Sequence, residues 1–147
     1  MTNYFSAFEI SATGLMAEKL KLEAVAMNIA NANTTAAPGT APYQPVRVMT
    51  RPIGIGDFGH HLQRAGAMSP GGVQALGLEP MSVQPRMIFD PHHPDADANG
   101  FVAHANVDPL SEMVSMTAAV RAYEANIKAI SAAKVMAQKA LEIGGNR

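Results

Sequence analysis

The stretch DPLSEMVSMTAAVRAYEANIKAISAAKVMAQKALEI, residues 108–143, decides the fold. One line of residues recurs in it every seven positions, and a second line follows the first by three. This a/d spacing predicts a long helix with a narrow seam that packs against another helix. The first line holds Met113, Val120, Ile127, Lys134 and Leu141, and the second holds Met116, Tyr123, Ile130 and Ala137. Asp108 is suited to cap the helix and Pro109 to open it, while Gly144 and Gly145 end it.

The N-terminal residues, from about Tyr4 to Asn33, predict a second long helix. They contain no proline and only one glycine, Gly14, so helix formers dominate. A seven-residue repeat is again present, in Phe8, Leu15, Leu22 and Ile29, and it is flanked by Phe5, Ala12, Val25 and Ala26. Asn31 and Asn33 predict the helix end, because asparagine tolerates a left-handed turn.

The middle of the chain, residues 36–108, is rich in proline and glycine and predicts short strands joined by long loops. Strands are expected where apolar and polar residues alternate from Val46 to Met49, and again at Val73–Leu78 and Val83–Phe89. Asp90-Pro91 and the segment from Asp95 to Gly100 are predicted turns.

The predicted fold class is therefore α+β, with three segments: residues 1–35, 36–108 and 109–147. Long helices with narrow apolar seams are marginal alone. We expect the two terminal helices to pair as an antiparallel coiled coil and to present their remaining faces to neighbouring subunits. The alternative is a closed helical hairpin in a monomeric domain, which would suit a soluble binding or adaptor module.

Composition excludes several functional classes. Lys and Arg number 11 against 12 for Asp and Glu, so the basic excess that nucleic-acid binding requires is absent. The chain has no cysteine, which excludes disulfides, thiolate nucleophiles and cysteine zinc sites. No apolar run approaches the roughly eighteen residues of a membrane span. We expect no cofactor, no nucleic-acid partner and no direct membrane span, and the N-terminus lacks the basic start of a signal peptide.

Three motifs invite an enzyme or metal interpretation, and each is better explained as a loop. GIGDFG, residues 54–59, matches a dinucleotide fingerprint but lacks the helix that should follow it. DADANG, residues 95–100, matches half of an EF-hand loop, whose twelfth position is here Asn106 rather than glutamate. The pairs His60-His61 and His92-His93 lack the helical spacing of a zinc site, and no serine has a recognisable catalytic partner. The sequence predicts a protein that is not an enzyme.

Three segments carry a resemblance to a known family. NIANANTT, residues 28–35, resembles the motif of flagellar axial proteins, which are rod, hook and hook-associated subunits. DPHHPDADANGFVAHANVDPLSEMV, residues 90–114, and the helix of residues 121–144 resemble the proximal rod proteins of that family more specifically. Ala105 departs from the pattern, which leads us to expect proline before Asn106.

The resemblance implies a structural subunit of the bacterial flagellar basal-body rod, which crosses the periplasm and transmits torque. It implies export through the flagellar type III apparatus, and copies of the chain and other rod proteins as partners. The terminal helices would form the inner coiled-coil core. The expected helix-seam and assembly residues are Phe8, Leu15, Leu22, Val25, Asn28, Ile29, Asn31, Met113, Met116, Val120, Tyr123, Ile127, Ile130 and Leu141. The expected structural turn comprises Asp90, Pro91, Pro94, Asp95, Asp97 and Gly100.

Overall fold

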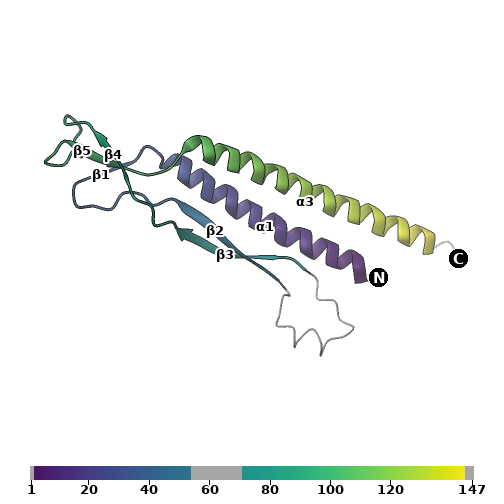
Figure 1. Cartoon of the computed structure of the whole chain (residues 1–147). Coiled ribbons are helices and arrows are strands. Elements are labelled where there is room, and N and C mark those ends of the chain that lie inside the picture. The colour runs from purple at the N-terminus through teal and green to yellow at the C-terminus, as the bar shows by residue number, and fades with distance from the viewer. Residues whose placement is uncertain (1, 54–70, 145–147) are drawn as a thin grey trace, which may run out of the picture. The chain divides into compact units, whose positions relative to one another are not determined.

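The computed structural model describes residues 2–53 and 71–144, with side chains from residue 7 onward in the first range. Two long helices enclose five short strands along the chain, which confirms the α+β class (Figure 1). The helices are α1, Thr2–Ala30, and α3, Pro109–Gly144. The strands are β1, Thr35–Ala36; β2, Val46–Pro52; β3, Val73–Pro80; β4, Arg86–Phe89; and β5, Phe101–His104.

The start of α3 is capped as predicted. The Asp108 carboxylate accepts hydrogen bonds from the backbone amides of Leu110, at 3.2 Å, and Ser111, at 3.3 Å. Pro109 is the first helical residue, where its missing N–H costs nothing. Glu112 adds a negative charge to the first turn, near the positive end of the helix dipole.

The end of α1 differs from the prediction in its mechanism. The helix stops at Ala30, and no described residue other than glycine has a positive φ, so neither Asn31 nor Asn33 makes a left-handed turn. Instead the Asn31 side-chain amide donates to the Met27 carbonyl at 2.8 Å, and the Thr34 hydroxyl donates to the Asn31 carbonyl at 2.7 Å. These side-chain donors reinforce backbone bonds at the helix end, because the Met27 carbonyl also accepts the Asn31 N–H and the Asn31 carbonyl also accepts the Thr34 N–H, each at 3.1 Å.

The strands form two sheets, and only part of this was predicted. A two-stranded sheet pairs β2 with β3, close to the expected positions. A three-stranded sheet has the order β1-β5-β4, antiparallel throughout. Strands β1 and β5 were not predicted, and β4 begins only at Arg86, because Pro85 has no N–H for the ladder.

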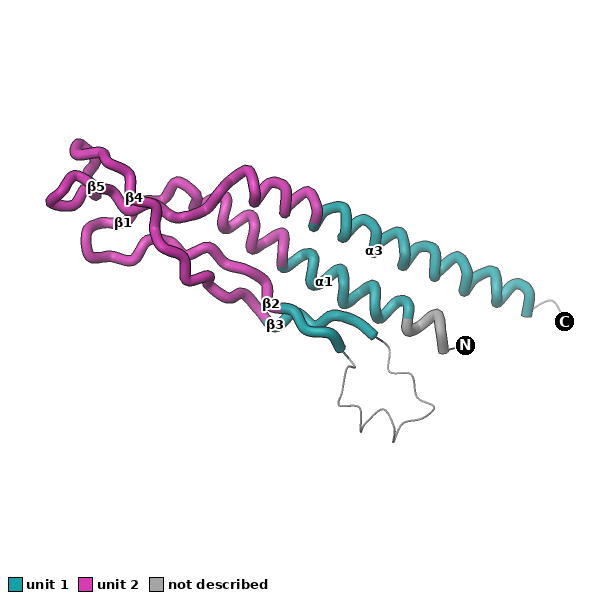
Figure 2. Tube along the Cα trace, viewed as in Figure 1, with its two compact units in different colours: residues 1–20, 50–76, 119–147 teal, residues 21–49, 77–118 magenta. Residues whose placement is uncertain are grey.

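The chain divides into two compact units, coloured in Figure 2. Unit 1 comprises residues 1–20, 50–76 and 119–147, and unit 2 comprises residues 21–49 and 77–118. In unit 2 the core contains Ala32, Ala105 and Val107, with Tyr43 packed against them, and Val102 of β5 is fully buried. Ala105 donates its N–H to the Thr34 carbonyl at 3.1 Å, a bond that proline at this position could not form.

In unit 1 the first part of α1 contacts both of its neighbours. A Cβ added at Gly14 would lie 3.0 Å from the Asn126 side-chain nitrogen, so α1 approaches α3 closely here. On another side of α1, the Thr13 hydroxyl accepts the backbone N–H of Val73 at 3.2 Å. Gly72 leaves room for this bond, because a Cβ there would lie 2.9 Å from the same hydroxyl. Among the described residues, no helix is both long and apolar enough to cross a membrane.

Candidate assembly site

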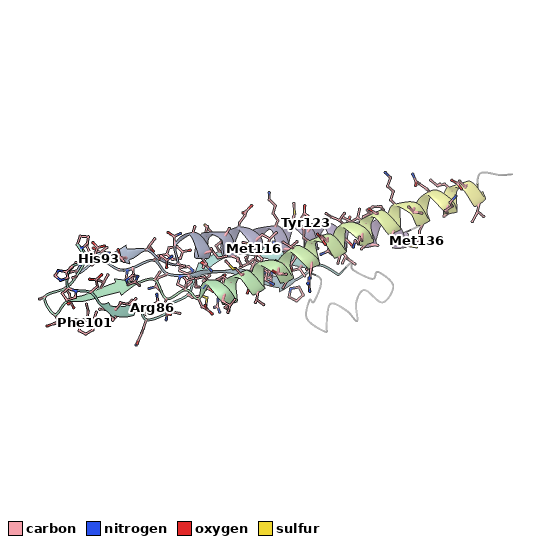
Figure 3. The ribbon with its side chains drawn as sticks, turned by 90° about the horizontal axis from the view of Figure 1, so that it is seen from above. Arg86, His93, Phe101, Met116, Tyr123 and Met136 are labelled. Carbon is pink, nitrogen blue, oxygen red and sulfur yellow. The ribbon has the colours of Figure 1, made fainter. Side chains whose placement is uncertain are left out.

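The buried side of α3 is one residue away from the predicted seam. The line Met116, Tyr123, Ile130 and Ala137 is half-buried, as the spacing suggested, and Met116 and Tyr123 are labelled in Figure 3. The second buried line, however, is not the predicted line of Val120 and Ile127. It lies one position earlier in the sequence and comprises Glu112, Ala119, Asn126 and Ala133. Ala119 and Ala133 are 0% and 2% exposed. Small residues on this line allow a close helix approach, which Gly14 completes in unit 1.

The larger apolar side chains of α3 therefore remain accessible. Val120 is 39% exposed and Ile127 43%, and the same line continues through Met113 and Leu141, which are more exposed still. Each of these four side chains keeps more than a third of its surface accessible. An isolated apolar residue on a surface needs no explanation, but exposed apolar residues that recur along one line of a helix, here interrupted by Lys134, indicate an interaction surface.

The predicted seam residues of α1 are more buried than Val120 and Ile127 of α3. Phe8, Leu15, Leu22 and Ile29 are half-buried, and Val25 is 5% exposed. The most buried positions also include Ala17 and Ala24, which the repeat did not single out. Met16 lies on the opposite side, 73% exposed. Asn31, half-buried, caps the helix end.

Asn28 joins α1 to the start of β2 in unit 2. Its side chain is 2% exposed, and its amide makes three hydrogen bonds. The nitrogen donates to the Val46 carbonyl at 2.9 Å, and the oxygen accepts the Val46 N–H at 2.8 Å and the Tyr43 hydroxyl at 2.9 Å. The side chain thus pairs with both backbone groups of Val46, as a neighbouring strand would.

Tyr43 completes this contact, and the sequence pattern did not identify it as a functional residue. Burial raises the pKa of its phenol, and the negative charge of Glu112 raises it further. The hydroxyl therefore remains protonated at neutral pH and donates to Asn28. Its sequence context, between Pro42 and Pro45, indicated only a loop.

The predicted turn is held mainly by Asp97. One oxygen of its carboxylate accepts the backbone N–H groups of Asn99 and Phe101, each at 2.8 Å. Gly100 has φ +82°, and its carbonyl accepts the N–H of Asp90 at 2.9 Å. These bonds close the loop between β4 and β5 and place Phe101 against Phe89, with ring centroids 5.4 Å apart.

The remaining turn residues support the same loop. Asp95 accepts the Thr35 hydroxyl and so fastens the loop to β1, while its N–H donates to Nδ1 of His93 at 3.1 Å. Pro91 lies against Gly100, and Pro94 is exposed.

No group of metal-binding side chains occurs among residues 2–53 and 71–144. GIGDFG and His60-His61 lie outside the described residues.

Gly100 provides a test of the turn. We expect Gly100→Val to destabilise unit 2 by about 2–4 kcal/mol, because valine is strained at this φ and its Cβ would lie 3.0 Å from the Phe89 ring. Gly39, at φ +84° with nothing within 4 Å, is the matched control, and Gly39→Val should cost only the strain, about 1–2 kcal/mol.

The same measurement separates a turn from a calcium site. Asp97→Ala should cost about 1–2 kcal/mol through its two lost bonds. Urea unfolding of the three variants, with and without a calcium chelator, gives the order of their free energies of unfolding. Stability that depends on calcium and is lost in Asp97→Ala would contradict a purely structural turn.

Comparisons with known proteins identify relatives along nearly the whole chain. Residues 8–37 match the family described as "Flagella basal body rod protein", and residues 98–143 match "Flagellar basal body rod FlgEFG protein C-terminal". The flagellar basal-body rod protein FlgC of Bacillus subtilis is 37% identical over 147 residues, covering 95% of this chain and 97% of the relative. The FlgC protein of Aquifex aeolicus is 34% identical, covering 97% and 98% of the two chains. That of Salmonella typhimurium is 31% identical, covering 93% and 95%.

Proposed function

Since the chain belongs to the FlgC family of flagellar basal-body rod proteins, we propose that it polymerises through its terminal helices and transmits torque through them. It is a structural subunit of the flagellar basal-body rod, and other rod proteins are its partners in assembly. Residues 1–35 and 109–147 would build the inner core at the proximal end of the rod. Residues 36–108 would make the outer contacts.

The observation that carries this proposal is the set of exposed apolar side chains on one line of α3, Met113, Val120, Ile127 and Leu141, which Lys134 interrupts before Leu141. A helix that buries alanines on one side and leaves valine and isoleucine accessible on its flank has a second apolar surface to bury. Adjacent subunits in a rod offer such a surface, and burial there would lock neighbouring subunits together. Rigid transmission of torque requires that kind of packing.

An antiparallel coiled coil between α1 and α3 is part of the proposal. It is supported in unit 1 by the Gly14–Asn126 contact and by the opposite chain directions of the two helix segments (Figure 2). It is supported along α3 by the alternating three- and four-residue spacing of the buried positions.

Three further elements of the proposal come from the family. The chain would leave the cytoplasm through the flagellar type III export apparatus, and its rod would cross the periplasm. We infer that the protein is not an enzyme, since the relatives are named as rod proteins and the described loops use their carboxylates to fasten turns.

Basal bodies purified from the source bacterium test the proposal directly. Cells without the chain should lack a complete rod and should not swim, and a plasmid copy should restore both properties. Mass spectrometry and electron cryo-microscopy of the restored basal bodies should find the chain in the rod. Complete rods in cells that lack the chain would contradict the proposal.

A further inference from the structure

A small open pocket lies on one face of the three-stranded sheet in unit 2. Met87 of β4, Ala103 of β5 and Ala36 of β1 are cross-strand partners in register and therefore share this face, together with Phe101. Phe101 is labelled in Figure 3. The pocket has a volume of about 180 Å³, below the roughly 300–1,000 Å³ of small-molecule sites, so its size suits one protruding side chain.

One wall of the pocket is acidic. Asp95 and Asp97 line it, and each uses one carboxylate oxygen in the turn bonds described above. The other oxygen of each carboxylate accepts no hydrogen bond from the described residues. No described Lys or Arg pairs with either group, and the only neighbouring basic side chain is His93, at 3.9 Å from Asp95. An apolar floor beside two uncompensated carboxylates suits an apolar side chain flanked by cations.

The same chain carries a surface of that chemistry on α3. Val120, Ile127 and Val135 are exposed. They lie on two adjoining lines of the helix, which also carry three exposed basic residues, Arg121, Lys128 and Lys134. None of the three forms an ion pair with another described residue. We call this surface the basic-apolar stripe: Val120, Arg121, Ile127, Lys128, Lys134 and Val135.

We propose that the pocket of one copy receives the basic-apolar stripe of a second copy, with Ile127 inserted between Met87 and Phe101. Lys128 and Lys134 would then face Asp95 and Asp97. Two different surfaces of the same chain make a heterologous contact, and repetition of such a contact builds a ring or, where the rotation does not close, an open helical assembly. This inference rests on the proposed function and names one contact within it.

Photo-crosslinking from Thr40, an exposed residue of the pocket wall, identifies the occupant. The full chain carrying p-benzoylphenylalanine at position 40 would be the only copy in swimming cells, and adducts would be mapped by mass spectrometry. We expect a link to residues 120–135 of a second copy, visible as a product of twice the chain's mass. The same probe at Ser82, which is exposed and does not line the pocket, should give no such link.

The other possible crosslinking results each contradict one of the two proposals. An adduct with a different rod protein, or none in rods that contain the chain, would overturn the second-copy contact and leave the proposed function intact. Absence of the chain from the rod would refute the proposed function itself.

Charge exchange provides an independent measurement. Thr40→Lys places a cation at the pocket, where it would repel the stripe, and we expect swimming to fall by about tenfold or more. Adding Lys128→Glu to that variant should restore part of the swimming, because the introduced glutamate faces the introduced lysine while Lys134 still faces Asp95 and Asp97. Unimpaired swimming of Thr40→Lys, with the chain present at normal levels, would overturn the proposal.

Discussion

Ile127→Asp is expected to abolish swimming while leaving the isolated subunit folded. The Ile127 side chain is 43% exposed in unit 1, so an aspartate there remains hydrated and should change the free energy of unfolding by no more than about 0.5 kcal/mol. In the rod, the same position would be packed against a neighbouring subunit. Burial of a carboxylate without a partner costs several kcal/mol at every copy, which is enough to stop assembly. Val120→Asp should behave in the same way.

Ser131→Asp is the matched control. Ser131 is exposed on α3 one turn after Ile127, on a line that already contains the polar residues Glu124 and Gln138. The added charge is the same, but no apolar contact is removed, so swimming should be largely retained. Circular dichroism of the purified chains verifies helix content, and swimming in soft agar measures assembly. Normal swimming of Ile127→Asp as the only copy would count heavily against helical polymerisation.

The sequence predicted both helices because their signals are local. The repeats in residues 8–29 and 113–141 lie within single elements, and Asp108-Pro109 specifies a helix start through the bonds of the Asp108 carboxylate to Leu110 and Ser111. The buried side of α3 could not be predicted in the same way. The lines that contain Val120 and Ala119 have the same spacing, and hydrophobicity favours Val120. The structure buries Ala119 because a small side chain permits the closer approach.

The strands and the Asn28 contact depend on residues far apart in the chain. Strand β1 has two residues and exists only through pairing with β5, so Thr35-Ala36 has no pattern of its own. From the sequence, Asn28 is predicted only to lie near a helix end. Its partners Tyr43 and Val46 lie 15 and 18 residues later, in a proline-rich segment. The family resemblance identified the NIANANTT segment, residues 28–35, but the role of its first asparagine required the three-dimensional structure.

Asn28→Leu is expected to produce the largest loss of stability, about 3–6 kcal/mol. Leucine has a similar volume but cannot bond to Val46 or Tyr43, so the Val46 N–H, the Val46 carbonyl and the Tyr43 hydroxyl all lose their partner. A buried polar group without a bond costs about 1–3 kcal/mol, and these three partly buried groups should lie in the lower half of that range. A change of this size is a large fraction of a typical folding free energy of about 5–15 kcal/mol. Strand β2 should separate from α1 before the rest of unit 2 unfolds.

Two variants separate this contact from a general effect on the motif. Asn33→Leu alters an exposed asparagine of the same segment and should change stability by no more than about 0.5 kcal/mol. Tyr43→Phe removes one of the three bonds and should cost about 1 kcal/mol. Hydrogen exchange measured at the Val46 amide gives the most direct result, because that N–H donates to Asn28 at 2.8 Å. We expect its protection to disappear in Asn28→Leu and to persist in Asn33→Leu; equal protection in both would show that Asn28 does not hold β2 to α1.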